Sequence, residues 1–319
     1  MRKAVVTGFL LRRMCNPNSG GGTSMFARTN CRDGVARSLA AAVALLAAAI
    51  VAATIGVTPA SSITSGGAKI DEHAGEIFTD ERDCFETVDR RPVPIGLVRS
   101  YVPDAYTPVV LTAPGPPIWP NPGQQVGNVG FTDYVCKSFS VNGHKPRPTI
   151  MSMGVVVLTP TGDPPRRLYV LWVGTDNPLL FARLQQLGVN VYFIPRSSYT
   201  EVTTAAADGT QRTQIVVNYV GNGPGGLDYT RTITATEGVL PTPPDGPAAG
   251  WYTLGTKGEV ALSFLNDFTS LGTATVCLDY APTSIPTQYG LTPFTNGPCF
   301  PALRPFFRGS WQGHWELLD

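Results

Sequence analysis

The stretch that decides the fold is Ile150-Met-Ser-Met-Gly-Val-Val-Val-Leu158 together with Leu168-Tyr-Val-Leu-Trp-Val173. Both runs are short, apolar and rich in β-branched or aromatic residues, which is typical of buried strands. Between them lies Thr159-Pro-Thr-Gly-Asp-Pro-Pro-Arg-Arg167, whose prolines and glycine indicate a loop. The sequence therefore predicts two strands joined by a short connection.

Further strand-like segments follow toward the C-terminus, separated by Pro- and Gly-rich loops. They are Val189–Ile194, Tyr199–Thr204, Thr213–Val220, Tyr229–Ala235, Glu259–Leu265, Thr273–Tyr280 and Ser310–Leu318. One short helix is predicted over Leu179–Leu187, because Asp176-Asn177-Pro178 supplies a cap and a first-turn proline, and Gly188 ends it. These elements predict an all-β fold, an antiparallel β-sandwich of jelly-roll type with one or two short helices, preceded by an extended N-terminal arm.

The chain upstream of this sandwich differs from it in composition. Residues 1–37 hold seven Lys or Arg side chains and a single acid, so we expect a basic, disordered arm. Residues 38–58 are apolar and we expect a helix there. Residues 59–128 are predicted to form an arm with a short helix near residues 80–89 and a Pro-rich extended linker. Residues 129–319 are assigned to the jelly roll.

The helix near residues 80–89 is predicted from its first turn. Asp80 is a suitable cap, and Glu81 and Asp83 complement the helix dipole. Cys84 and Phe85 would then share one apolar face. Pro92 sets the latest end of the helix, because proline disfavours helical geometry in the residue before it.

The apolar segment Ser38–Val57 is about long enough to cross a bilayer as a helix. Three interpretations stay open. It is a signal peptide or anchor behind a positive region, with Pro59-Ala-Ser-Ser62 as a cleavage or entry point. It is a membrane-active segment of a capsid-type protein. Or it is an Ala-rich helix packed against protein.

Composition limits the classes of function. The chain has 29 Pro and 34 Gly against 24 Lys+Arg and 23 Asp+Glu, which indicates many turns and a lightly charged surface. A net charge of +1 gives no overall attraction to nucleic acid or anionic membranes. Contacts with either must therefore be local, through residues 1–37 or Ser38–Val57.

The six cysteines are widely spaced and form no CxxC pair, which argues against a zinc site. If the chain is exported, Cys84, Cys136, Cys277 and Cys299 can form two disulfides with three possible connectivities. Buried free thiols are the alternative, because free Cys behaves as a small hydrophobic residue.

No pattern in the sequence predicts a catalytic, cofactor-binding or metal site. Asp71-Glu-His73 with Glu76 is interpreted as a solvated charge cluster. Gly221–Gly226 is not followed by Lys-Ser/Thr, so a phosphate loop is not expected. Gly309-Ser-Trp-Gln-Gly313 lacks the spacing of a nucleophile elbow. We therefore predict a protein that is not an enzyme, with no cofactor and no small-molecule substrate.

Four segments, taken in order, resemble the jelly-roll coat proteins of picorna-like positive-strand RNA viruses. They are Gly75–Phe85, before the barrel; Leu179–Ile194, similar to a short helix and its following strand; Val216–Gly226, similar to a strand that ends in a Pro-Gly turn; and Val276–Tyr289, similar to a late strand and its Pro-rich loop.

This resemblance implies a structural capsid protein located in the virion. Its partners would be copies of itself or sister coat subunits in an icosahedral shell, with viral RNA as a partner of residues 1–37 and a membrane as a partner of Ser38–Val57. The alternative that the residues leave open is a cell-envelope β-sandwich, exported or membrane-anchored, that acts as a binding module. A secreted hydrolase lacks its catalytic residues.

Overall fold

The computed structural model describes residues 75–113, 121–162, 165–207, 209–221, 226–238, 246–247, 250–280, 283–291, 299 and 304–318. The basic arm, the apolar segment and the Asp71–His73 cluster lie outside the described residues, and their assignments stay predictions. The described part is all-β and sandwich-like, built on one large and mostly antiparallel sheet. The predicted fold class is confirmed at this level.

The helices and strands follow one another along the chain with few helical interruptions. In chain order they are β1 (Glu76–Pro94), α2 (Ile95–Tyr101), β2 (Leu111–Thr112), β3 (Gln125–Val141), β4 (Arg147–Thr161), β5 (Arg166–Thr175), α3 (Pro178–Leu187), β6 (Val191–Phe193), β7 (Ser198–Ala205), β8 (Gln211–Tyr219), β9 (Tyr229–Thr236), β10 (Gly246–Pro247), β11 (Trp251–Gly255), β12 (Gly258–Tyr280), α4 (Ile285–Gln288) and β13 (Arg304–Leu317).

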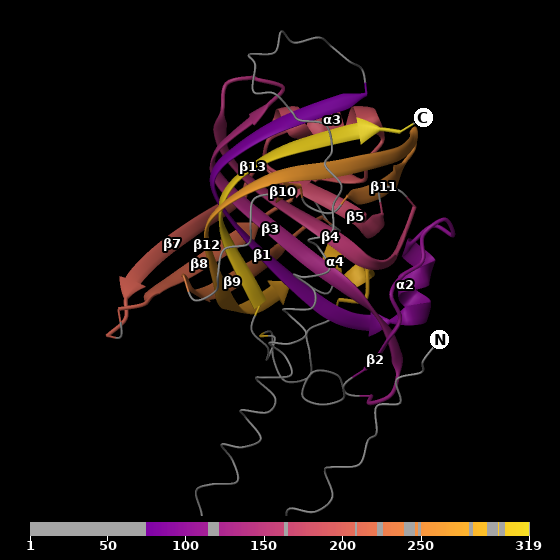
Figure 1. Cartoon of the computed structure of the whole chain (residues 1–319), viewed down its shortest axis with the longest axis horizontal. Helices are drawn as coiled ribbons and strands as arrows, with labels where there is room; N and C mark the ends of the chain where they lie inside the picture. Colours follow the sequence, from indigo (N-terminus) through magenta and orange to yellow (C-terminus); the bar gives the residue numbers. More distant parts are fainter. Residues whose placement is uncertain are drawn as a thin grey trace, which may run out of the picture. The chain divides into compact units, whose positions relative to one another are not determined.

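Seven of these strands form a closed ring. The sheet runs β11-β5-β4-β3-β1-β13-β12, and β12 pairs again with β11 (Figure 1). Six of the contacts around the ring are antiparallel, and the β11–β5 contact is parallel. Closure removes the free edges that an open sheet would expose.

A second layer continues from the far half of β12. The order there is β12-β9-β8-β7, all antiparallel. β12 is long enough to belong to both parts, and its pairing register with β13 shifts between Phe268 and Ser270. This irregularity lets one strand bend from the ring into the second layer.

The two parts bury two separate hydrophobic cores. The barrel core draws side chains from all seven ring strands, including Cys84, Met153 and Trp315. The interlayer core lies between the ring strands and the β8–β9 layer, and includes Phe131 and Ile233. Because successive side chains of a strand point to opposite faces, β1 and β3 contribute to both cores.

The helix predicted near residues 80–89 is wrong, because these residues lie in the middle of β1. β1 pairs with β3 on one side and β13 on the other. Asp83 has a φ of 50° and sits where the register shifts, so it forms a bulge rather than a first helical turn. Pairing with two neighbours outweighs the local capping pattern. β1 also places the start of the sheet upstream of residue 129.

The predicted helix after the central strands is confirmed as α3. The Asn177 side chain accepts hydrogen bonds from the backbone N–H groups of Leu179 and Leu180, and Gly188 ends the helix at a φ of 81°. Leu180 and Leu184 turn their side chains into the barrel core. Among the described helices, none combines the length and apolar character needed to cross a membrane.

Two disulfides select one of the three possible connectivities. Cys84 of β1 is bonded to Cys136, its direct partner on β3, and Cys277 is bonded to Cys299. The first lies in the barrel core.

Candidate functional site

The interlayer core contains a group of five charged side chains, which we call the arginine–aspartate cluster. Its members come from four strands and are Asp89 and Arg91 of β1, Asp133 of β3, Arg231 of β9 and Arg304 of β13. The local strand pattern explains their direction. Asp89 and Arg91 continue the alternation that sends Phe85 and Val93 into this core.

The cluster is held by direct ion pairs. Arg91 Nε donates to Asp89 Oδ2 at 2.9 Å, and Arg304 Nε donates to Asp89 Oδ1 at 2.8 Å. Arg231 Nη1 pairs with Asp133 Oδ2. Four of the five side chains are at most 1% exposed, and Arg304 is 13% exposed. Arg304 is therefore the member that borders solvent.

Positive charge is in excess within the cluster, since its described members are three arginines and two aspartates. Burial alone would raise the pKa of Asp89, but neighbouring guanidinium groups, led by Arg91, lower it to about 2. Burial lowers the pKa of Arg231 to about 9, and the attraction of Asp89 offsets this only in part. Among the described residues, Nε and Nη2 of Arg231 have no hydrogen-bond partner. Such donors are costly in an apolar core.

A hydroxyl pair extends the cluster along β9. Tyr229 donates its hydroxyl hydrogen to Asp133 Oδ1 at 2.9 Å, and Ser152 Oγ lies 2.6 Å from the same hydroxyl. Because Tyr229 has one hydrogen to give, Ser152 is the donor in the second contact. Burial raises the pKa of Tyr229, which keeps the hydroxyl protonated. The protonated Tyr229 hydroxyl is therefore held between one acceptor, Asp133, and one donor, Ser152.

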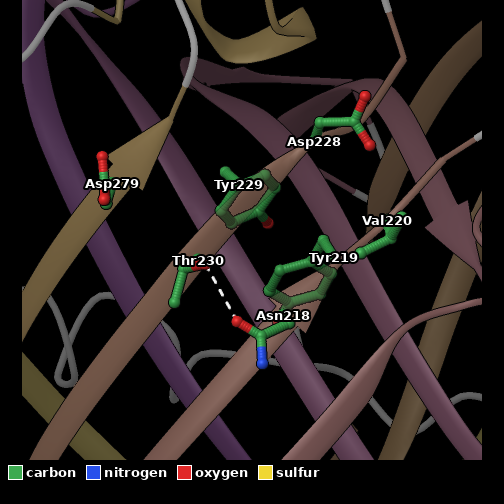
Figure 2. A pocket seen from close by; sticks show the side chains of 7 residues that line it. All are labelled: Asn218, Tyr219, Val220, Asp228, Tyr229, Thr230 and Asp279. Atoms are coloured by element: carbon green, nitrogen blue, oxygen red, sulfur yellow. Dashed lines mark hydrogen bonds between the residues drawn. The ribbon is translucent and has the colours of Figure 1, made fainter. Parts of the chain in front are cut away.

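A depression of about 480 Å³ borders this tyrosine. It is lined by Asn218, Tyr219, Val220, Asp228, Tyr229, Thr230 and Asp279. Figure 2 shows Tyr219 and Tyr229 side by side between the two aspartates; their ring centroids are 4.3 Å apart. The two carboxylates disfavour an anion in the depression itself. Both tyrosines are buried beneath it.

The barrel core holds a second ionisable group, Glu81 and Glu86 beside Tyr134. Burial raises the pKa of Glu81 to about 8 and that of Glu86 to about 7. Glu81 accepts a hydrogen bond from Thr79 Oγ1 at 2.8 Å. These acids lie on the other face of β1 from Asp89 and Arg91. They form a second buried polar site, separate from the cluster.

The patterns weighed in the sequence do not assemble into a site. Ser310 lies within β13, and its neighbour Gly309 is required by packing, since a Cβ there would meet the Asp267 carbonyl oxygen at 2.2 Å. Within the described part of the chain, Glu76 Oε1 lies 3.6 Å from His314 Nε2. The residues of the cluster carried no motif. The sequence offered one indication of them: a charged residue at a position of a predicted strand where the alternation calls for a buried side chain, as at Arg231.

No protein-family model and no curated protein matches the sequence. Several solved structures do. The enduracididine biosynthesis enzyme MppR complexed with pyruvate is 11% identical, covering 82% of this chain and 96% of that chain at a TM-score of 0.46. An acetoacetate decarboxylase is 12% identical, with 76% and 87% covered and a TM-score of 0.41. An acetoacetate decarboxylase-like enzyme from Sphingomonas wittichii RW1 is 11% identical, with 83% and 99% covered and a TM-score of 0.38.

These matched structures are enzymes and not coat proteins, so the resemblance to picorna-like capsid proteins is wrong. The predicted structural role falls with it, as do the virion location and the coat-subunit, RNA and membrane partners. The predictions that the chain is not an enzyme and has no small-molecule substrate are contradicted by the same finding. The motif order misled because short strands ending in Pro-Gly turns are common to many β-folds.

Proposed function

We propose that the protein is an enzyme that binds a small organic carboxylate in the arginine–aspartate cluster and supplies a proton to it from Tyr229. The observation that carries this proposal is the Arg231 guanidinium group. It is fully buried, pairs with Asp133 through one nitrogen, and leaves Nε and Nη2 without a partner among the described residues. A carboxylate matches these donors, because guanidinium binds it through two parallel hydrogen bonds.

The charge of the cluster supports the same class of substrate. With three arginines against two aspartates, a bound monoanion would bring the described members to neutrality. Burial makes this balance matter, since an uncompensated charge is far more costly inside a core than at a surface. Arg304 is the partly exposed member and gives the anion its first contact.

The proton donor is Tyr229, since its raised pKa keeps the hydroxyl protonated in the free protein. Its hydrogen, which Asp133 accepts there, turns to the bound substrate; the Ser152 hydroxyl keeps its own proton and donates a hydrogen bond to the phenolate that forms. Asp133 holds both Tyr229 and Arg231, and so fixes the donor relative to the anion-binding group. A positioned general acid of this kind contributes about 10²–10⁴-fold to a rate.

Binding is tested by calorimetric titration with pyruvate and acetoacetate, with acetamide as a neutral probe. We expect the two carboxylates to bind and acetamide not to. Arg231→Gln should weaken carboxylate binding at least about tenfold, the effect of losing one charge-assisted hydrogen bond. The matched control is Arg166→Gln, which removes an arginine from a pair with Glu259 outside the cluster. Equal weakening by both variants would contradict the proposal.

The acid–base role is tested by proton exchange of bound pyruvate in D2O, followed by NMR. Tyr229→Phe should lower the exchange rate about 100-fold or more, as expected for the loss of a general acid. Pyruvate binding should change little, because Arg231 is intact. An unchanged exchange rate in a folded Tyr229→Phe variant would remove Tyr229 from the reaction.

A further inference from the structure

Three side chains with metal-binding atoms meet in the barrel core. A carboxylate oxygen of Glu81 and the Sγ atoms of Cys84 and Cys136 all lie within 4.8 Å of one another, and all three residues are buried. Residues three apart in a regular strand point to opposite faces. The bulge at Asp83 cancels this alternation, so Glu81 and Cys84 share the barrel side. Cys136 stands directly opposite Cys84 on β3.

The Glu81 carboxyl group is oriented by one hydrogen bond and keeps one oxygen without a partner among the described residues. Its Oε1 accepts the Thr79 hydroxyl, which orients the carboxyl group. Its Oε2 has no hydrogen-bond partner in the described part of the chain, and the residue is 1% exposed. Gly313 leaves the space, since a Cβ there would lie 2.3 Å from Thr79 Oγ1. A buried oxygen without a hydrogen-bond partner is unfavourable, and a purely structural disulfide beside it does not explain why this oxygen is there.

We infer that reduction of the Cys84–Cys136 disulfide turns this point into a zinc site with two thiolates and the Glu81 carboxylate as ligands. Zn²⁺ favours four ligands drawn from sulfur, nitrogen and oxygen. The fourth position is taken by water or by the second oxygen of Glu81. Tetrahedral coordination at Zn–S distances of about 2.3 Å requires the two sulfur atoms to move apart after reduction.

The chemistry has two steps. A small dithiol reduces the disulfide: its two sulfur atoms form a new cyclic disulfide, and Cys84 and Cys136 each gain a hydrogen. Zn²⁺ then binds and displaces both thiol protons and the Glu81 proton to the buffer. The bound metal holds the sulfur atoms apart and slows their reoxidation.

The strands keep their positions through reduction. The β1–β3 ladder extends on both sides of the disulfide, from Thr79 opposite Val141 to Pro94 opposite Val126. β1 is also paired with β13 along its first half. The ligands are thus presented by a sheet that is closed around them.

The test uses Co²⁺ as a spectroscopic probe of the full chain with Cys15 and Cys31 replaced by Ser. After reduction by dithiothreitol and its removal without oxygen, we expect one equivalent of Co²⁺ to bind and give a thiolate-to-cobalt charge-transfer band. Zn²⁺ should displace it. The oxidised chain should show no band. Glu81→Gln should weaken binding more than about 100-fold, beyond the roughly 10–100-fold that is usual for residues that only support a ligand.

Two cysteine pairs give a matched comparison. Cys84→Ser with Cys136→Ser should abolish the band, whereas Cys277→Ser with Cys299→Ser should leave it. The opposite result, or no band in a reduced and folded chain, overturns the proposal. If circular dichroism shows that the metal-free reduced chain loses its sheet, Zn²⁺ must restore it, and failure to do so also overturns the proposal.

Discussion

The barrel core and the interlayer core both bury ionisable side chains, but they treat charge in opposite ways. In the interlayer core, acids and guanidinium groups form ion pairs, and the pKa of Asp89 falls to about 2. In the barrel core, Glu81 and Glu86 lie among apolar side chains and hydroxyl donors, and burial raises the pKa of Glu81 to about 8. The same strand, β1, supplies both sets from its two faces. Burial alone therefore does not decide the charge state of an acid; the partner across the core does.

This contrast predicts that the free energy of unfolding falls at both ends of the pH range: at alkaline pH because of the barrel-core acids (the alkaline limb) and at acid pH because of Asp89 (the acid limb). Glu81 and Glu86 have folded-state pKa values of about 8 and 7 against 4.5, so their contribution is complete below pH 4.5 and is lost as pH rises through 7 and 8. For Glu81 the loss is on the order of 5 kcal/mol. Asp89 has a lowered pKa, so its contribution is present above 3.8 and is lost as pH falls toward 2.

Urea denaturation across this pH range measures both limbs. Glu81→Gln should flatten the alkaline limb and leave the acid limb in place. Glu316→Gln, a change at an exposed position, is the control and should alter neither limb. A wild-type chain with equal stability at pH 5 and pH 9 would contradict the assignment of neutral acids to the barrel core.

The next largest effect on the free energy of unfolding is expected when an ion pair in the interlayer core is broken. Arg231→Met removes the partner of Asp133 and leaves a carboxylate buried, which should cost about 3–5 kcal/mol of unfolding free energy. The double variant Arg231→Met with Asp133→Leu should recover much of this loss, because no buried charge is left alone. Chemical denaturation measures both. A single variant within about 1 kcal/mol of wild type would show that the pair is not desolvated.

A smaller effect is expected at the hydroxyl that extends the cluster. Tyr229→Phe keeps the ring packed on Tyr219 and removes the hydrogen bonds to Asp133 and Ser152. The expected loss is about 1–3 kcal/mol, since two buried groups each lose a partner. Tyr199→Phe serves as the control, because its ring packs against Phe85 at the edge of the same core. Thermal unfolding measures both variants. A Tyr199→Phe variant that is less stable than Tyr229→Phe would contradict the hydrogen bonds assigned to the Tyr229 hydroxyl.

The smallest effect is expected for an ion pair outside both cores. Arg166 donates two hydrogen bonds to Glu259, each of 2.8 Å, yet its side chain is 35% exposed. Solvent screens such a pair, so Arg166→Gln should change the unfolding free energy by less than about 1 kcal/mol. Chemical denaturation at low and high salt checks this value. A loss as large as that of Arg231→Met would mean that burial does not separate the two pairs.

Local pattern was enough to predict the strands around Leu158 and Val173 and the helix that ends at Gly188, because those segments carry their own apolar spacing, cap and terminator. It failed near Asp80, where a capping pattern was overruled by pairing with β3 and β13. The order of strands in a sheet is set by contacts between distant segments. The order of short motifs along the sequence does not record it, and the resemblance to coat proteins inferred from that order was therefore wrong.

The arginine–aspartate cluster could not be predicted for the same reason. Asp89 and Arg304 are 215 residues apart and meet only because β1 pairs with β13. Asp133 and Arg231 meet across two layers, and no local spacing records that. The approach of Glu81 to the paired cysteines was missed as well, because Asp83, which forms the bulge that brings Glu81 and Cys84 to one face, was interpreted as part of a first helical turn.

The most direct measurement is a crystal structure of the chain with pyruvate bound, compared with the same crystal form without it. We predict the carboxylate within hydrogen-bond distance of the Arg231 guanidinium group, with Arg304 beside it and the Tyr229 hydroxyl facing the carbonyl oxygen. Pyruvate bound elsewhere, with Arg231 contacting Asp133 alone, would contradict the proposal that the interlayer core is the substrate site.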